Sequence, residues 1–195
     1  MAGGPSTPEL AVAVSNGGGL GSIAAGYLSP EDFEQVLAQT RELTDIFNAN
    51  LFVPETVRPD TEDLKRYASA LGEAFGEAVD VPEFSDDHFS DKIDIVLEHT
   101  PAVVTFTFGL PDPAIIRRIK SAGSSVGITV TNTDEAVASV DAGADFLIAQ
   151  STEAGGHLSV HRQDQAVTST VLPVLVQEVR SKVSVPLVAA GGIGT

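Results

Sequence analysis

Six short runs of mostly apolar residues alternate with stretches that carry helix signals, and this alternation limits the fold of the chain more than any other feature. Most of the runs are continuously apolar, which is typical of parallel strands covered on both faces. A repeated strand–helix order predicts an α/β fold built on a parallel sheet. The predicted strands span residues 20–25, 46–53, 102–108, 125–131, 144–150 and 186–190.

The segments between these runs contain residues that start helices. Ser29 precedes Pro30 and two acids, which is the pattern of a capping serine before a proline at the first helical position. The pair Asp112–Pro113 opens a further helix, which is expected to end near Gly123, and residues 133–136 begin another. The helices therefore have recognisable starts between most of the predicted strands.

The stretch at about 55–99 is longer than one crossover needs. It contains two apolar helical faces, one around Leu64 and Leu71 and one around Ile93 and Val96, with Pro82 between them. We expect a crossover of two helices here, inside a single domain that spans residues 1–195.

Polar or glycine residues follow several of the predicted strands, and their distribution favours a barrel. TIM-barrel sites are assembled from the carboxyl ends of many strands, whereas a Rossmann fold concentrates its glycines in the first strand–helix turn. A complete barrel has eight strands in roughly 250 residues. We therefore predict a TIM (β/α)8-type barrel that is incomplete, with about six of eight strands and the first and last missing; a smaller complete fold is the alternative. Gly109, Asn132 and Gly191 follow strands, Gln150 ends one, and Asn50 lies within the strand 46–53.

Composition excludes several kinds of function. The chain has no cysteine, so disulfides, thiolate nucleophiles and iron–sulfur clusters are excluded, and redox chemistry needs a bound cofactor. A net charge of −16 makes nucleic acid and anionic membranes unexpected partners. The N-terminus lacks the pattern of a signal peptide and no apolar run is long enough to cross a bilayer, so we expect a cytoplasmic location.

The segment 150–157, Gln-Ser-Thr-Glu-Ala-Gly-Gly-His, is the main candidate for a functional site. Paired glycines allow a ligand to approach the backbone, and His157 is suited to move a proton near neutral pH. Glu153 is expected to fix the loop through backbone N–H groups. His157 and His161 are four residues apart, but the glycines argue against a helix and we predict no metal site; His161 is expected to be solvated. Asn50 lies in an apolar strand, where its amide needs a ligand or backbone partner; the alternative is that the loop of a neighbouring strand satisfies it.

Several segments in order resemble the nitronate monooxygenases, formerly called 2-nitropropane dioxygenases, across nearly the whole chain. The loop 150–157 is similar to the QGxEAGGH motif of that family, with Ser151 in place of the glycine. Residues 48–54 resemble the third strand of the family, residues 108–111 its FGxP turn, and residues 189–193 the AAGGI turn that binds phosphate in flavin-dependent barrels.

This resemblance implies an FMN enzyme that oxidises alkyl nitronates or nitroalkanes with O2 to carbonyl compounds and nitrite. It implies that His157 is the catalytic base or the group that places the nitronate. Asn50 and Gln150 would hold the isoalloxazine ring by hydrogen bonds. Backbone N–H groups of Gly155, Gly191 and Gly192 would bind the cofactor and its phosphate.

Two other interpretations stay open at this stage. An FMN-dependent enoyl-ACP reductase of fatty-acid synthesis shares the barrel and a similar loop, and it would consume NAD(P)H without oxygen. Alternatively, the chain is a non-catalytic fragment that has lost its cofactor, because strands are missing at both ends. The sequence does not decide between a monomer and a homo-oligomer.

Overall fold

The computed structural model describes residues 2–56, 58, 60–164 and 170–193. Within these residues the strands and helices alternate as expected, and each predicted strand is present with ends that differ by no more than two residues. The strands are β1 (Gly21–Ala24), β2 (Phe47–Phe52), β3 (Val103–Thr107), β4 (Ser125–Val130), β5 (Phe146–Gln150) and β6 (Leu187–Ala190). The helices are α1 (Pro8–Asn16), α2 (Pro30–Leu43), α3 (Thr61–Phe75), α4 (Phe89–His99), α5 (Pro113–Ser121), α6 (Thr133–Asp141) and α7 (Leu172–Lys182).

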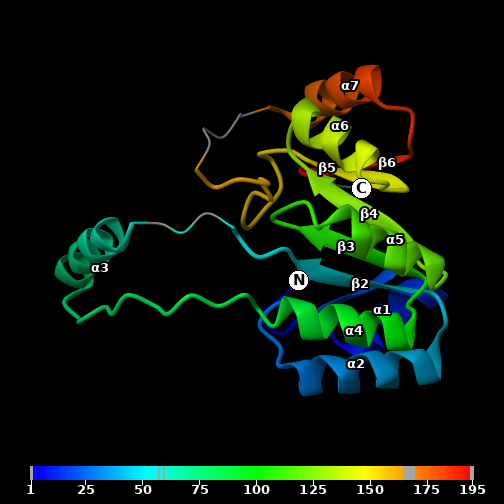
Figure 1. Ribbon diagram of the computed structural model, residues 1–195, viewed down its shortest axis with the longest axis horizontal. Coiled ribbons are helices and arrows are strands. Elements are labelled where there is room, and N and C mark those ends of the chain that lie inside the picture. Colours follow the sequence, from blue (N-terminus) through cyan, green and yellow to red (C-terminus); the bar gives the residue numbers. More distant parts are fainter. Residues whose placement is uncertain (1, 57, 59, 165–169, 194–195) are drawn as a thin grey trace.

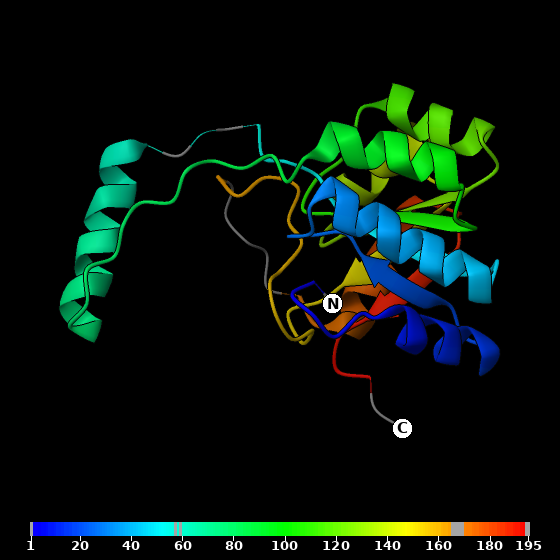
Figure 2. The same ribbon diagram turned by 90° about the horizontal axis from the view of Figure 1, so that it is seen from below.

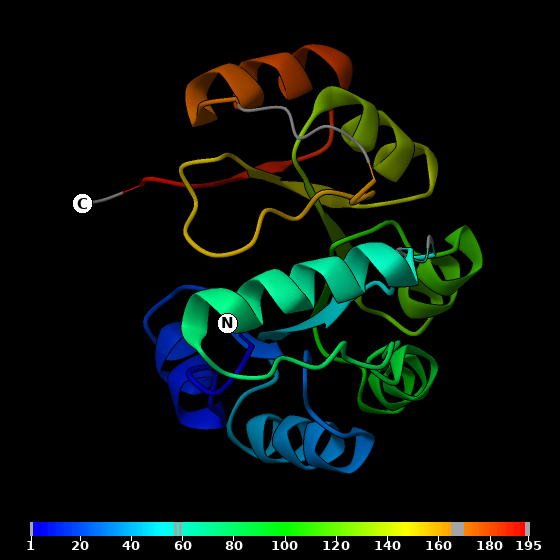
Figure 3. The ribbon, with the colours of Figure 1, turned by 90° about the vertical axis from the view of Figure 1, so that its left-hand side faces the viewer.

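The strands form one sheet in which spatial order equals sequence order. The order is β1-β2-β3-β4-β5-β6, and every neighbouring pair is parallel. A doubly wound Rossmann sheet reverses its strand order at a switch point, and this sheet does not. The sheet is curved, with helices along its outer side (Figures 1 and 3). The described part of the chain is therefore a partial (β/α) barrel of the TIM type.

The core lies between the outer face of the sheet and the helices. Alternate residues of a strand point to opposite faces, so one set from each strand meets the helices. This set includes Phe47 and Phe106, which are fully buried together with Phe33 of α2. Burial of an aromatic side chain of this kind stabilises the fold by roughly 1.5–3 kcal/mol. Further core residues are Ile23, Leu37, Leu51, Ile93, Val96, Val104, Ile116, Ile119, Val126, Ile128, Leu147, Leu175 and Val179.

The inner face of β2 and β3 is polar. Asn48 donates from its amide to the hydroxyl oxygens of Ser22 (2.8 Å) and Thr105 (2.9 Å). One residue pair further along the strands, Asn50 donates to the hydroxyl oxygens of Thr105 (3.0 Å) and Thr107 (2.9 Å). The carbonyl oxygen of the Asn48 side chain is buried without a hydrogen-bond partner.

The helix starts follow the capping residues of the sequence. Ser29 accepts a hydrogen bond from the backbone N–H of Asp32, and Asp112 accepts one from Ala114. For α6, the capping side chain is Asn132, which accepts from the N–H of Glu135. Each cap satisfies a backbone donor that the helix itself cannot pair, which is worth about 1 kcal/mol.

Both helices expected at about 55–99 are present, and they differ in how they are packed. Helix α4 lies on the barrel, with Ile93 and Val96 buried. Helix α3 stands away from the barrel (Figures 1 and 2). Its Leu64 faces the returning connection, because Leu64, Val81 and Phe84 line one cavity. No helix among the described residues is long and apolar enough to cross a membrane.

Candidate functional site at the carboxyl ends of the strands

A cavity of about 390 Å³ lies at the carboxyl ends of β1, β2 and β3. Tyr27 follows β1, Phe52 ends β2, Phe108 follows β3, and His157 comes from the loop after β5. Of the six residues that the sequence singled out for a site, all within the described ranges, only His157 lines this cavity. The complete lining is Tyr27, Phe52, Val53, Pro54, Glu55, Phe84, Ser85, Asp86, Asp87, Phe108, His157 and Gln163.

One wall of the cavity is a row of aromatic rings that ends at His157. Tyr27 and Phe52 meet edge to face with ring centroids 5.5 Å apart, and Phe52 and Phe108 meet at 4.9 Å. The ring of Phe108 lies edge-on to the imidazole of His157 at 6.2 Å. Such edge contacts are favourable beyond the area they bury. The exposed imidazole is therefore set beside an apolar wall that can hold a carbon chain.

Gln150, at the end of β5, fixes the loop that carries His157. Its side-chain amide donates to the carbonyl oxygen of His157 (3.1 Å), and its side-chain oxygen accepts from the N–H of Ser159 (2.6 Å). One side chain thus pairs with two backbone groups on either side of residue 158. This contact is a loop anchor that the sequence did not indicate, and a role of Gln150 in flavin binding stays a prediction.

Ser159 connects the same loop to the turn after β3. Its fully buried hydroxyl oxygen accepts from the backbone N–H of Phe108 (2.8 Å). Phe108 has a φ of 69°, in the left-handed region that non-glycine residues rarely adopt. Strained conformations of this kind persist where surrounding contacts hold them and gather at functional sites. The turn and the loop therefore hold the two rings of Phe108 and His157 in place together.

The far part of the loop is anchored by Glu135 of α6. Its carboxylate accepts from the N–H of His161 (2.8 Å) and from the N–H of Thr131 (2.6 Å). A ring nitrogen of His161 lies 2.9 Å from the carbonyl oxygen of Thr129. The expectation of a solvated His161 was wrong, because this side chain is half-buried and bonded to β4. No cluster of metal-ligating side chains occurs among the described residues.

The glycine turn after β6 packs against the turn after β5. Gly191 and Gly192 have φ values of 132° and 62°, which favour glycine. A Cβ on Gly191 would lie 2.3 Å from the hydroxyl oxygen of Ser151, so the serine occupies the space that the glycine leaves. Glu153 accepts from the N–H of Leu172 (2.8 Å) at the start of α7, which confirms its expected structural role.

The turns and the inner face of the sheet leave room for a ligand in two respects. Gly155 has open space where a side chain would stand, so a ligand can approach the backbone there. The polar inner face below holds the unpaired side-chain oxygen of Asn48, which can accept a hydrogen bond. The side-chain NH2 group of Asn50 donates to hydroxyls of the neighbouring strand β3 itself, whereas the alternative interpretation of the sequence expected partners in a neighbouring strand's loop.

Fold and site together define a TIM-barrel-type α/β protein with a histidine-bearing loop at the carboxyl ends of its parallel strands. The nitronate monooxygenase family profile matches residues 1–195, so the chain belongs to that family. Probable nitronate monooxygenases of Bacillus subtilis and Staphylococcus saprophyticus are each 36% identical over 197 residues, covering 99% and 97% of this chain. The chain spans 56% of the length of each of these relatives.

Solved structures agree with this assignment. Nitroalkane oxidase from Streptomyces ansochromogenes has a TM-score of 0.89 and 38% identity, covering 99% of this chain and 57% of that one. FabK from Thermotoga maritima has a TM-score of 0.70 and 31% identity, and the match covers 99% of this chain and 49% of FabK. Both likenesses confirm the predicted fold.

Proposed function

We propose that this chain supplies the site of an FMN-dependent oxidoreductase that converts alkyl nitronates or nitroalkanes, with O2, to carbonyl compounds and nitrite. The observation that carries the proposal is the place of His157, an exposed imidazole beside an aromatic-walled cavity at the carboxyl ends of the strands. Membership of the nitronate monooxygenase family supports the reaction class. A cytoplasmic location and a homo-oligomer stay predictions.

The role of His157 follows from the chemistry of the substrate. A nitro group acidifies the carbon next to it, so a neutral imidazole suffices to take the α-proton of a nitroalkane or to hold a nitronate in place. Gln150 donates a hydrogen bond to the carbonyl oxygen of His157 and accepts one from the N–H of Ser159, which fixes the backbone on both sides of residue 158 and thereby limits the positions of the imidazole. The aromatic row holds the carbon chain of the substrate by apolar contact.

Bound FMN would supply the electron transfer from the nitronate to O2. We assign Asn50 and Gln150 to the isoalloxazine ring and Gly155, Gly191 and Gly192 to backbone contacts with the cofactor and its phosphate. The left-handed φ of Gly191 and Gly192 supports this assignment, because successive glycine N–H groups can converge on an anion.

The test combines cofactor binding with turnover. Retention of the flavin absorbance band after gel filtration, followed by nitrite release from ethyl nitronate, is the expected result. His157→Asn should keep FMN bound and lower kcat by about 100-fold or more, the size typical of general acid–base catalysis. His88→Asn is the matched control, since the His88 side chain is exposed and does not line the cavity.

Unchanged nitronate turnover in His157→Asn would refute the assigned role. Consumption of NAD(P)H without oxygen, in place of nitronate oxidation, would favour the enoyl-ACP reductase alternative. A folded chain that retains no flavin would favour the non-catalytic alternative.

A further inference from the structure

Lys92 is a buried charge that the proposed reaction does not use. Its side chain, on α4, is 1% exposed, and among the described residues it is the one charged residue in the buried class. The ammonium lies 2.9 Å from a carboxylate oxygen of Asp87 and is buried without a hydrogen-bond partner. The contact is therefore mainly electrostatic, and it compensates a charge that is costly to bury alone.

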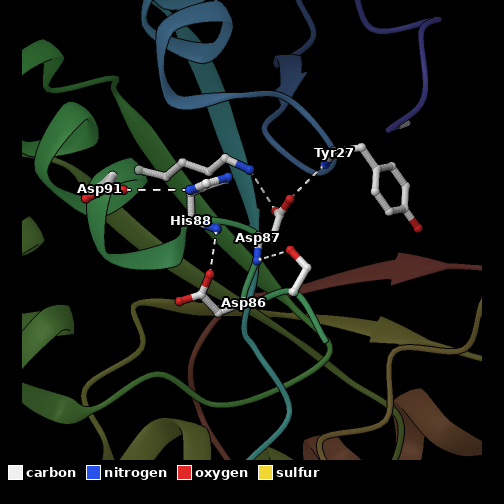
Figure 4. A network of polar contacts seen from close by, with 7 residues as sticks. Tyr27, Asp86, Asp87, His88 and Asp91 are labelled. Atoms are coloured by element: carbon white, nitrogen blue, oxygen red, sulfur yellow. Dashed lines mark hydrogen bonds and ion pairs between the residues drawn. The ribbon is translucent and has the colours of Figure 1, made fainter. Parts of the chain in front are cut away.

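Asp87 joins this charge to the loop after β1. One of its carboxylate oxygens faces Lys92 and the other accepts from the backbone N–H of Tyr27 at 3.0 Å (Figure 4). Tyr27 and Asp87 both have left-handed backbone conformations, with φ values of 68° and 55°. The carboxylate thus holds two strained positions that are 60 residues apart in the sequence.

These contacts lie behind one wall of the cavity. Tyr27 and residues 84–87 line the cavity on the side of β1 and α4, whereas Phe108 and His157 line it from β3 and β5. Within residues 84–87, the N–H of Asp87 donates to the hydroxyl oxygen of Ser85 at 3.0 Å (Figure 4). A shift of this segment would separate Asp87 from the ammonium of Lys92, whose side chain is shielded from solvent.

We propose that the Lys92–Asp87 ion pair is a positioning device that sets the wall formed by Tyr27 and residues 84–87 and thereby selects the length of the carbon chain on the substrate. The choice of substrate rests on the proposed function. The contact between Lys92 and Asp87 rests on the geometry alone. A short nitronate needs only the part of the cavity near His157. A longer chain reaches Tyr27 and the segment 84–87, so its affinity depends on whether that wall is held.

Lys92→Met tests the ion pair in a folded protein, because methionine keeps the buried aliphatic part of the side chain and removes the charge. The double variant Asp87→Ala/Lys92→Met leaves no unpaired buried charge and serves if the single variant is unstable. Asp94→Asn is the matched control, since Asp94 lies on the same helix in an exposed ion pair with Arg118. Hydrogen exchange at the Tyr27 amide is measured first, and it requires no activity.

Exchange at Tyr27 should become faster by about tenfold in Lys92→Met, because the carboxylate that accepts from this amide loses its support, and faster still in the double variant, which removes that carboxylate. With hexyl nitronate, KM should rise about fivefold while kcat stays within twofold, as expected when apolar contact remote from the reaction is lost. With ethyl nitronate, both constants should stay close to those of the unaltered protein.

Unchanged exchange at Tyr27 in a folded Lys92→Met variant would overturn the proposal. Faster exchange at Tyr27 with an unchanged ratio of the KM for hexyl nitronate to the KM for ethyl nitronate would also overturn it, because the wall would then not select chain length. Failure of the unaltered protein to oxidise any nitronate would refute the proposed function instead, and the exchange experiment would still decide whether the ion pair holds Tyr27.

Discussion

Removing the hydroxyl of Ser159 tests how firmly the loop with His157 is held. Ser159 is fully buried and its oxygen is 2.8 Å from the N–H of Phe108. Ser159→Ala leaves this N–H without the acceptor that pairs it in the native protein. It leaves intact the bond from the Ser159 N–H to the side chain of Gln150. The variant therefore isolates the contact between the loop and the turn after β3.

The size of the effect follows from two opposing contributions. A buried donor left without a partner costs about 1–3 kcal/mol. The left-handed conformation of Phe108 carries an intrinsic cost of roughly 1–2 kcal/mol, part of which is released if the turn relaxes. We expect the free energy of unfolding to fall by about 1–2 kcal/mol, and exchange at the Phe108 amide to become faster.

Urea denaturation of Ser159→Ala is compared with that of Ser181→Ala. Ser181 is exposed and donates to the carbonyl oxygen of Glu178 (2.7 Å), so its loss should change the free energy of unfolding by less than about 0.5 kcal/mol. Equal effects in the two variants, together with unchanged exchange at Phe108, would refute the view that Ser159 holds the turn.

Two further predictions concern the rim of the site. A Cβ on Gly26 would lie 2.3 Å from the ring of Phe52, and this ring is fixed between those of Tyr27 and Phe108. Gly26→Ala should therefore lower the free energy of unfolding by about 1–3 kcal/mol, measured by thermal denaturation. An unchanged Tm would contradict this packing. Arg162 lowers the pKa of the Asp164 carboxyl, mainly through their hydrogen bond. The pairing is therefore present above the ordinary pKa of an aspartate and lost as pH falls through the lowered value. Arg162→Gln should return the pKa of Asp164 to its ordinary range in an NMR titration, and an unchanged low pKa would contradict the assignment.

The fold was predictable because its signals are local. Each buried parallel strand is an apolar run of a few residues, and each helix start carries its own capping side chain, such as Ser29 or Asp112. The position of α3 was not predictable in the same way. Its apolar face indicates a helix correctly, but how a helix packs depends on the partner that covers it, and here that partner is the connection around Val81 and Phe84.

The candidate site was predictable only in part. His157 was found because it stands in a recognisable loop after a strand, and Glu153 was expected to bind backbone N–H groups, as it does at Leu172. Ser159 and the Lys92–Asp87 pair carried no signal. A serine and a lysine look ordinary in a sequence. The partner of Ser159 is 51 residues away, and the spacing of Lys92 and Asp87 indicates no particular contact.

The contacts that hold the loop after β5 were not predictable from the sequence because of the geometry of a parallel sheet. All carboxyl ends of the strands meet at one edge, so a loop that leaves one strand is surrounded by turns from other strands. The loop after β5 is accordingly held by Phe108, 51 residues before Ser159, and by Glu135, 26 residues before His161. Each of these contacts exists only once the sheet has formed. The position of His157 therefore depends on the register of β3, β4 and β5, and substitutions that disturb that register should impair the site even where they lie far from it.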